Sequence, residues 1–204
     1  TELFWECNAL RLVCFGCEET PVTRIDFSTS FANTRNLVYT VLTTADGTNS
    51  CITDAEGRQY NKSYATTKNA KAVKTANALY AEVGENEAIL IKVYDKQCVS
   101  YDLSNVEGSG REAIYFLGDN AFENSALEHI NFPNKLEYIG TSAFNKCVSL
   151  KEVNLNKVKR LGNYCFINSG LEVINAPCIT DISATECFGY VGSFKVGSFG
   201  SKEH

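Results

Sequence analysis

Four phenylalanines recur at a fixed interval in the second half of the chain. Phe122, Phe144, Phe166 and Phe188 are each separated by 22 residues, and each follows a small residue, which is alanine in the first two copies and cysteine in the last two. A self-similar period of this length is typical of solenoids, in which one repeat cannot bury its own apolar side chains and stacks on its neighbours to share a core. The interval therefore predicts a scaffold.

A second apolar block follows each phenylalanine. These blocks read LEHINF from Leu127, LKEVNL from Leu150 and LEVINA from Leu171, and each is apolar at its first, fourth and sixth positions. This is the pattern of leucine-rich repeats. Because successive side chains of a strand point to opposite faces, the fourth and sixth residues are expected to point inward. Stacked copies then predict a parallel sheet.

The residues beside those inward pairs are expected to face outward. They form our candidate ligand-binding set, which is His129, Asn131, Glu152, Asn154, Val173 and Asn175. The asparagine column within this set has two readings of equal weight. Stacked asparagines can hydrogen-bond along a solenoid, which is structural, and the same exposed sheet face is where solenoids usually bind partners.

The stretch IGTSAFNKCVSL, Ile139 to Leu150, is the clearest copy. Ile139, Phe144 and Leu150 are predicted to be core, Gly140 a turn and Cys147 a buried thiol.

Residues 1–108 carry weaker patterns. Strand-like runs include LRLV, NLVYTVLTT and ILIKVYD, and Asp46-Gly47 and Glu56-Gly57 are expected at hairpins or tight turns. Thr66 to Val83 has a helix-like composition, whereas ALYAEV within it favours a strand, so its structure stays open. SNVEGSGR, Ser104 to Arg111, reads as a linker. We therefore expect a β-rich region over 1–108, of degenerate repeats or a separate domain, and leucine-rich repeats with a C-terminal cap or tail over 109–204.

Composition excludes several function classes. The net charge is -5 and the 19 lysines and arginines are scattered, which argues against nucleic acid, so the densest basic run, KVKR at Lys157 to Arg160, is interpreted as a solvated face. No run of eighteen or more apolar residues is present to span a membrane. The chain begins with threonine and contains no methionine, which fits removal of an export leader and equally fits a cytosolic fragment.

Most of the nine cysteines are interpreted as buried thiols. Cys165 and Cys187 replace the small residue before the repeat phenylalanine, where tight packing explains them without reactivity. Cys14 and Cys17 form a C-x-x-C that could be a redox pair or half of a zinc site, but no second C-x-x-C follows it. A local disulfide among Cys7, Cys14 and Cys17 is also left open.

Catalytic and metal signals are weak. The two histidines are His129, expected on the outward strand face beside Glu152, and His204 at the chain end. An acidic group comprising Asp46, Asn49, Asp54 and Glu56 fits no calcium loop and is interpreted as a turn. We therefore expect no catalytic residues, no metal and no cofactor.

The quoted repeats, with IGTSAFNKCVSLKEVNL as the best copy, resemble the BspA-like or type-5 leucine-rich repeats of bacterial surface and secreted proteins. The resemblance covers roughly 114–190. It implies a leucine-rich-repeat solenoid with one short parallel β-strand per repeat and loop or short-helical returns. It also implies a secreted or lipid-anchored protein that binds other macromolecules without catalysis.

The favoured hypothesis is a non-enzymatic adhesion module that presents its sheet face to a protein or glycan. The alternatives are a passive spacer or docking arm in a surface assembly, and a thiol redox protein that uses Cys14 and Cys17. The oligomeric state is left open.

Overall fold

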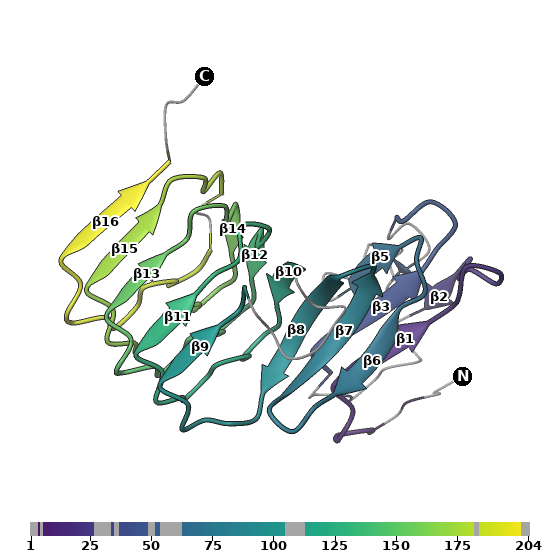
Figure 1. Cartoon of the computed structure of the whole chain (residues 1–204), viewed down its shortest axis with the longest axis horizontal. Coiled ribbons are helices and arrows are strands. Elements are labelled where there is room, and N and C mark those ends of the chain that lie inside the picture. Colours follow the sequence, from purple (N-terminus) through teal and green to yellow (C-terminus); the bar gives the residue numbers. More distant parts are fainter. Residues whose placement is uncertain are drawn as a thin grey trace. The chain divides into compact units, whose positions relative to one another are not determined.

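A computed structural model describes residues 4, 6–26, 34, 37–48, 52–53, 63–104, 113–181 and 184–200 (Figure 1). The chain divides into two compact units. Unit 1 comprises Thr1–Val73 with Ala81–Glu85, and unit 2 comprises Lys74–Tyr80 with Asn86–His204. The expected boundary at 108/109 lies outside the described residues and stays a prediction.

Unit 2 carries the repeat sheet predicted from the LxxLxL blocks. Its strands are β9 (Ser100–Asp102), β11 (His129–Asn131), β13 (Glu152–Asn154), β15 (Val173–Ala176) and β16 (Val196–Phe199). β9 pairs with β11, and β13, β15 and β16 pair in that order, all in parallel. Figure 1 shows the five strands side by side. The predicted parallel sheet with one short strand per repeat is confirmed.

A second sheet takes up the Ile-Gly and Leu-Gly segments. β10 (Ala113–Leu117) pairs in parallel with β8 (Glu87–Val93) and with β12 (Tyr138–Ile139), and β12 pairs in parallel with β14 (Arg160–Leu161). Phe116, Tyr138 and Arg160 occupy one column at the 22-residue interval. Four turns, which carry β8 and β9, β10 and β11, β12 and β13, and β14 and β15, therefore each contribute one strand to the repeat-strand face and one to the second sheet.

Glycine in the Ile-Gly pairs serves close packing of neighbouring turns. The Gly140 amide donates to the Leu117 carbonyl at 2.9 Å, which continues the strand ladder, and its carbonyl accepts from the Ala143 amide at 3.3 Å, so Gly140 begins a turn as expected. A Cβ on Gly140 would stand 2.7 Å from the backbone nitrogen of Asp119 in the preceding turn. The absence of a side chain lets the two backbones approach.

The return segments between the sheets are runs of consecutive turns. None of the described residues is helical, so the short-helical form of the return is wrong for that part of the chain. Two non-glycine residues per turn have positive φ, again at the 22-residue interval; they are Asn120, Ser142, Tyr164 and Glu186, and Asn124, Lys146, Asn168 and Tyr190. This conformation turns their amides toward the next turn. The Asn120 amide donates to the Thr141 carbonyl at 2.9 Å, and the Ser142 amide donates to the Asn163 carbonyl at 2.9 Å.

The core of unit 2 is built on the periodic phenylalanines. Phe122 stacks on Phe144 with ring centroids 5.2 Å apart, Phe144 on Phe166 at 5.1 Å, and Phe166 on Phe188 at 5.8 Å. The ring planes lie within 7° of parallel. Ile139, Phe144, Cys147 and Leu150 are fully buried, as predicted. One column of aromatic rings therefore connects four successive turns.

The basic run 157–160 lies on the outside of unit 2, as expected. The Lys159 ammonium contacts the Glu137 carboxylate at 2.7 Å, and the Arg160 guanidinium lies 4.0 Å from Asp181 and 5.6 Å from the ring centroid of Tyr138. These contacts run along the solenoid, from one turn to the next.

Unit 1 is also built from parallel strands. β1 (Leu12–Phe15) pairs with β3 (Tyr39–Thr43), β3 pairs with β5 (Ser63–Thr66), and β2 (Ile25–Asp26) pairs with β4 (Ile52–Thr53). Leu37 and Leu42 form the centre of its apolar core. That residues 1–108 are degenerate repeats stays a prediction.

Two expectations in the first half are settled by this pairing. Asp46-Gly47 is a tight turn and not a hairpin, because it leads from β3 to β4 in a different sheet, and Gly47 has φ 71°. The open segment Thr66 to Val83 is extended, with β6 (Lys71–Lys74) and β7 (Ala78–Gly84) in it. Glu56-Gly57 lies outside the described residues.

Candidate ligand-binding face

The outward positions of the repeat sheet form aligned columns. His129 lies opposite Ser100 and Asn131 opposite Asp102 in the β9–β11 pair. Glu152 lies opposite Val173, and Asn154 opposite Asn175, in the β13–β15 pair. Buried residues between them, Val153 and Ile174, hold the strands onto the core. The polar side chains therefore stand on a rigid support.

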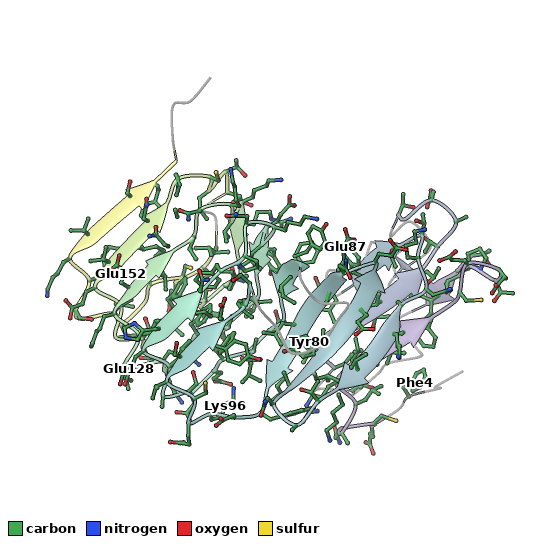
Figure 2. The ribbon with its side chains drawn as sticks, viewed as in Figure 1. Phe4, Tyr80, Glu87, Lys96, Glu128 and Glu152 are labelled. Carbon is green, nitrogen blue, oxygen red and sulfur yellow. The ribbon has the colours of Figure 1, made fainter. Side chains whose placement is uncertain are left out.

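An open hollow of about 430 Å³ lies over β9, β11 and β13. Figure 2 labels Glu152 and Glu128 beside these strands. The hollow is lined by residues of all three strands, which are Ser100, Tyr101, Asp102, His129, Ile130, Asn131, Glu152 and Asn154. The structure thus brings residues from three turns of the solenoid to one concave surface.

Four of the six predicted face residues line this hollow. They are His129, Asn131, Glu152 and Asn154, and all four are exposed. The other two lie on β15, outside the hollow, where Asn175 is exposed and Val173 is half-buried. The outward orientation is as expected for the exposed five, and the ligand-binding role of the set stays a prediction.

Asn131 is fixed by contacts within the protein. Its amide nitrogen donates to the Asp102 carboxylate at 3.1 Å and to the Ser104 hydroxyl at 3.2 Å. Asp102 also accepts from the Ser104 hydroxyl at 2.6 Å and from the Ser104 amide at 2.9 Å. The Ser104 side-chain hydrogen bond, supported by the backbone one and by Asn131, lowers the pKa of Asp102. At this end of the face the carboxylate is ionised and held in one orientation.

Three further side chains of the hollow have open hydrogen-bonding capacity. Within the described part of the chain, the side chains of His129, Glu152 and Asn154 make no hydrogen bond or ion pair with one another or with other residues. The interpretation that the asparagines hydrogen-bond along the solenoid therefore applies to Asn131. It does not apply to Asn154, whose amide is available to a ligand.

The β9 residues of the hollow were missed by sequence reasoning. Ser100 and Asp102 lie 29 residues before His129 and Asn131, so the 22-residue interval does not reach them. The signal that could have found them is the match between Tyr101-Asp102-Leu103-Ser104 and Ile25-Asp26-Phe27-Ser28, which marks the end of a strand in both places. Asp26 ends β2 as Asp102 ends β9.

The C-x-x-C thiols are in surroundings that do not favour redox chemistry. Cys14 lies in β1, and burial raises the pKa of its thiol to about 11. Cys17 contacts the Glu19 carboxylate at 3.3 Å and the Thr20 hydroxyl at 2.9 Å. Cys7, Cys14 and Cys17 are free thiols.

Burial of the other cysteines is only partly as expected. Cys147, Cys165 and Cys187 are buried, Cys98 and Cys178 are half-buried, and Cys7 is exposed. Cys51 lies outside the described residues. The expectation that most cysteines are buried is thus wrong for the eight that are described, because only the repeat positions point into the core.

The acidic group of the first half is described only at Asp46. Its carboxylate accepts from the Thr48 hydroxyl at 2.8 Å and from the Thr48 amide at 3.0 Å, which is a turn contact that lowers the pKa of Asp46. Asn49, Asp54, Glu56 and the terminal His204 lie outside the described residues.

Among the residues that are described, no three His, Cys, Asp or Glu side chains converge on a metal position. The part of the chain that the structure describes contains no helix that could span a bilayer.

Comparison with known proteins identifies similar repeats and folds. A family model for a BspA type leucine-rich repeat region matches residues 101–198, in six copies. A leucine-rich cell surface protein from Faecalibacterium prausnitzii is 16% identical, with a TM-score of 0.46, and the match covers 99% of this chain and 63% of that one. A leucine-rich repeat protein from Eubacterium ventriosum is 16% identical, with a TM-score of 0.42, and the match covers 70% of this chain and 31% of that one. The chain thus spans less than two thirds of either solved chain. No curated protein matches.

Proposed function

Since residues 101–198 belong to the BspA-type leucine-rich repeat family, we propose that this chain is a non-enzymatic binding module. It presents the repeat-sheet face over β9, β11 and β13 to a protein or glycan partner, at the cell surface or outside the cell. The surface setting rests on the family resemblance. The binding face rests on the geometry of the hollow.

The observation that carries the proposal is the set of unengaged polar groups in that hollow. His129, Glu152 and Asn154 offer an imidazole, a carboxylate and an amide from two adjacent strands, and their side chains make no hydrogen bond with described residues. Ionised Asp102, held by Ser104, stands at the other edge. Planar polar groups of this kind fix the orientation of a bound molecule, because each hydrogen bond has a preferred direction.

Binding without catalysis is favoured by the contacts of the single described imidazole. His129 lies opposite Ser100, but no hydrogen bond joins their side chains in the described structure. A nucleophile needs a base within hydrogen-bond reach and a third group that orients the base. His129 has neither among the described residues.

The test is a triple variant of the face, His129→Ala with Glu152→Ala and Asn154→Ala. The wild-type chain is first screened on an array of glycans and extracellular-matrix proteins, and the affinity for each ligand found is then measured by biolayer interferometry. We expect the triple variant to lose at least tenfold in affinity, since it removes three polar contacts worth about 1 kcal/mol each. Its far-UV circular dichroism should not change, because all three side chains are exposed.

A matched control lies on the other sheet. Glu137→Ala with Lys159→Ala and Arg160→Ala also removes three polar side chains near β12 and β14, of which Lys159 and Arg160 are exposed and Glu137 is half-buried. This control should keep wild-type affinity. Equal affinity of the wild type and the face variant would exclude this face as the binding site, and loss in both variants would show that the effect is not specific to this face.

A further inference from the structure

The small residues that precede the four periodic phenylalanines form a column along the solenoid, which changes from alanine to cysteine. Its members are Ala121, Ala143, Cys165 and Cys187, and all are buried. In each copy the residue lies one turn beyond its predecessor, so the last two positions place one thiol directly beside another. Packing needs only a small apolar side chain here, as the alanines of the first two copies show.

Cys165 and Cys187 occupy equivalent positions on adjacent turns that are held in register. The Phe166 amide donates to the Cys187 carbonyl at 2.8 Å, which fixes the two turns in register, and the rings of Phe166 and Phe188 are 5.8 Å apart. A disulfide needs Cα atoms about 4.4–6.8 Å apart, so it can join only segments that lie side by side, as these two turns do. Each of the two thiols also perturbs the pKa of the other, as expected for groups at equivalent positions of adjacent turns.

A neighbouring column shows the same proximity. The Ser125 hydroxyl and the Cys147 thiol, also 22 residues apart, lie 3.3 Å from each other inside the core. Side chains at equivalent positions of adjacent turns therefore touch in this solenoid. A bond between Cys165 and Cys187 needs no large movement of the backbone.

Only one of the two thiols is accessible from outside. Cys165 is 0% exposed, whereas Cys187 is 8% exposed and lines an apolar hollow of about 280 Å³. Leu161, Ala184, Phe188 and Phe199 form the rest of its lining. A small reagent that enters this hollow meets Cys187 first.

The thiol that is more accessible is also the one that loses its proton more readily. The hydrogen bond from the Cys165 thiol lowers the pKa of Cys187, while burial raises the pKa of Cys165 well above its ordinary value. The thiolate that attacks disulfides therefore forms on Cys187, the accessible partner.

We propose that Cys165 and Cys187 are an oxidative modification site, a dithiol that a low-molecular-weight disulfide converts into a disulfide between consecutive turns of the solenoid. The Cys187 thiolate attacks one sulfur of the reagent, which breaks the reagent's S–S bond and releases one thiolate. Cys165 then loses its proton and attacks the Cys187 sulfur, which forms the protein disulfide and releases the second thiol. Two protein thiols are oxidised and one reagent disulfide is reduced.

The experiment uses the full chain and oxidised glutathione. The folded protein is incubated with the reagent, remaining thiols are blocked with N-ethylmaleimide, and the chain is cut with trypsin and with the glutamate-specific protease Glu-C. Cleavage after Arg160, Glu172, Glu186 and Lys195 separates the three cysteines of this region onto different peptides, 161–172, 173–186 and 187–195. We expect mass spectrometry to detect 161–172 linked to 187–195, with the loss of two hydrogens.

Three variants keep the result interpretable. Cys165→Ser should stop at a stable glutathione adduct on Cys187, because the second thiol is missing. Cys187→Ser should leave Cys165 unmodified in the folded protein, because Cys165 is fully buried. Cys178→Ser removes a half-buried thiol outside the pair and should not affect the link. Far-UV circular dichroism checks that each variant is folded.

Several results would overturn the proposal. One is a glutathione adduct that persists on Cys187 in the wild type while Cys165 stays free. Another is a link from Cys187 to Cys178 or Cys147 instead of Cys165. A third is cross-linking that appears only when urea is present, which would show that the folded chain keeps the two thiols apart.

Discussion

Single glycines in this solenoid are required by the backbone of the neighbouring turn. Gly140 and Gly162 directly follow β12 and β14, and neither has a positive φ. A Cβ on Gly162 would stand 2.4 Å from the Thr141 nitrogen and 2.6 Å from the Gly140 carbonyl carbon. Backbone atoms cannot move aside as a flexible side chain can. The neighbouring turns can therefore approach this closely only if residue 162 is glycine.

We expect Gly162→Ala to destabilise the protein. The methyl group overpacks a site bounded by backbone, which costs about 1–3 kcal/mol. Urea denaturation followed by far-UV circular dichroism measures the loss. The matched control is Gly192→Ala, where a Cβ meets no atom within 4 Å, and its stability should stay near that of the wild type. If Gly162→Ala and Gly192→Ala were equally stable, the neighbouring turns would be able to move apart and accommodate the methyl group, and the prediction would be wrong.

At the scale of elements, the phenylalanine stack joins successive turns through large aromatic side chains in the core. Phe144 lies between Phe122 at 5.2 Å and Phe166 at 5.1 Å, and Phe132 contacts its ring edge-on at 6.0 Å. Phe144 is fully buried. Offset-stacked and edge-to-face aromatic pairs contribute about 0.5–1.5 kcal/mol beyond area burial. The stack therefore couples the turns to one another.

Phe144→Ala should cost about 3–5 kcal/mol in the free energy of unfolding, as for other buried phenylalanines that leave a cavity. Phe199→Ala serves as the control, because its side chain is 42% exposed and contacts the stack only through Phe188 at 5.9 Å. The control should lose less than half as much. Comparable losses from the two substitutions in urea denaturation would contradict the role of the central stack.

At the scale of the whole molecule, the turns of unit 2 interact mainly with their immediate neighbours. The amides of one return segment donate to carbonyls of the next, as from Phe122 to Ala143 at 2.9 Å and from Phe144 to Cys165 at 2.8 Å. Such nearest-neighbour stacks have stabilities that are roughly sums over repeats and interfaces. The number of turns can then change without loss of the fold.

Deletion of residues 141–162 removes one full 22-residue turn and joins Gly140 to Asn163, the residue equivalent to Thr141. We expect this variant to fold cooperatively with a lower urea midpoint, since one interface is lost. Deletion of residues 141–151 removes half a turn and places strand residues where a return is needed, so this variant should not fold. Far-UV circular dichroism and urea titration distinguish the two. If both deletions behave alike, the turns do not stack as independent units.

Much of unit 2 could be predicted from local pattern. The interval between Phe122 and Phe144 indicated stacked turns, and the alternation in LKEVNL placed Val153 inward and Glu152 outward, because a strand has a strict two-residue period. The region before residue 114 was harder, since β9 precedes β11 by 29 residues and breaks the interval. The parallel pairing in residues 12–66 likewise depends on contacts between distant segments.

The sequence by itself determined the repeat, its inward residues and the outward columns of the sheet. These depend on periodicity, which is local information. Only the tertiary structure decided that Asp102 and Ser104 engage Asn131 and leave His129, Glu152 and Asn154 without bonds to described residues. It also decided that Cys165 and Cys187 stand on adjacent turns in register, and that only Cys187 lines a hollow. Both results depend on which atoms of neighbouring turns meet, and that is set by the stacking of turns and not by any single segment.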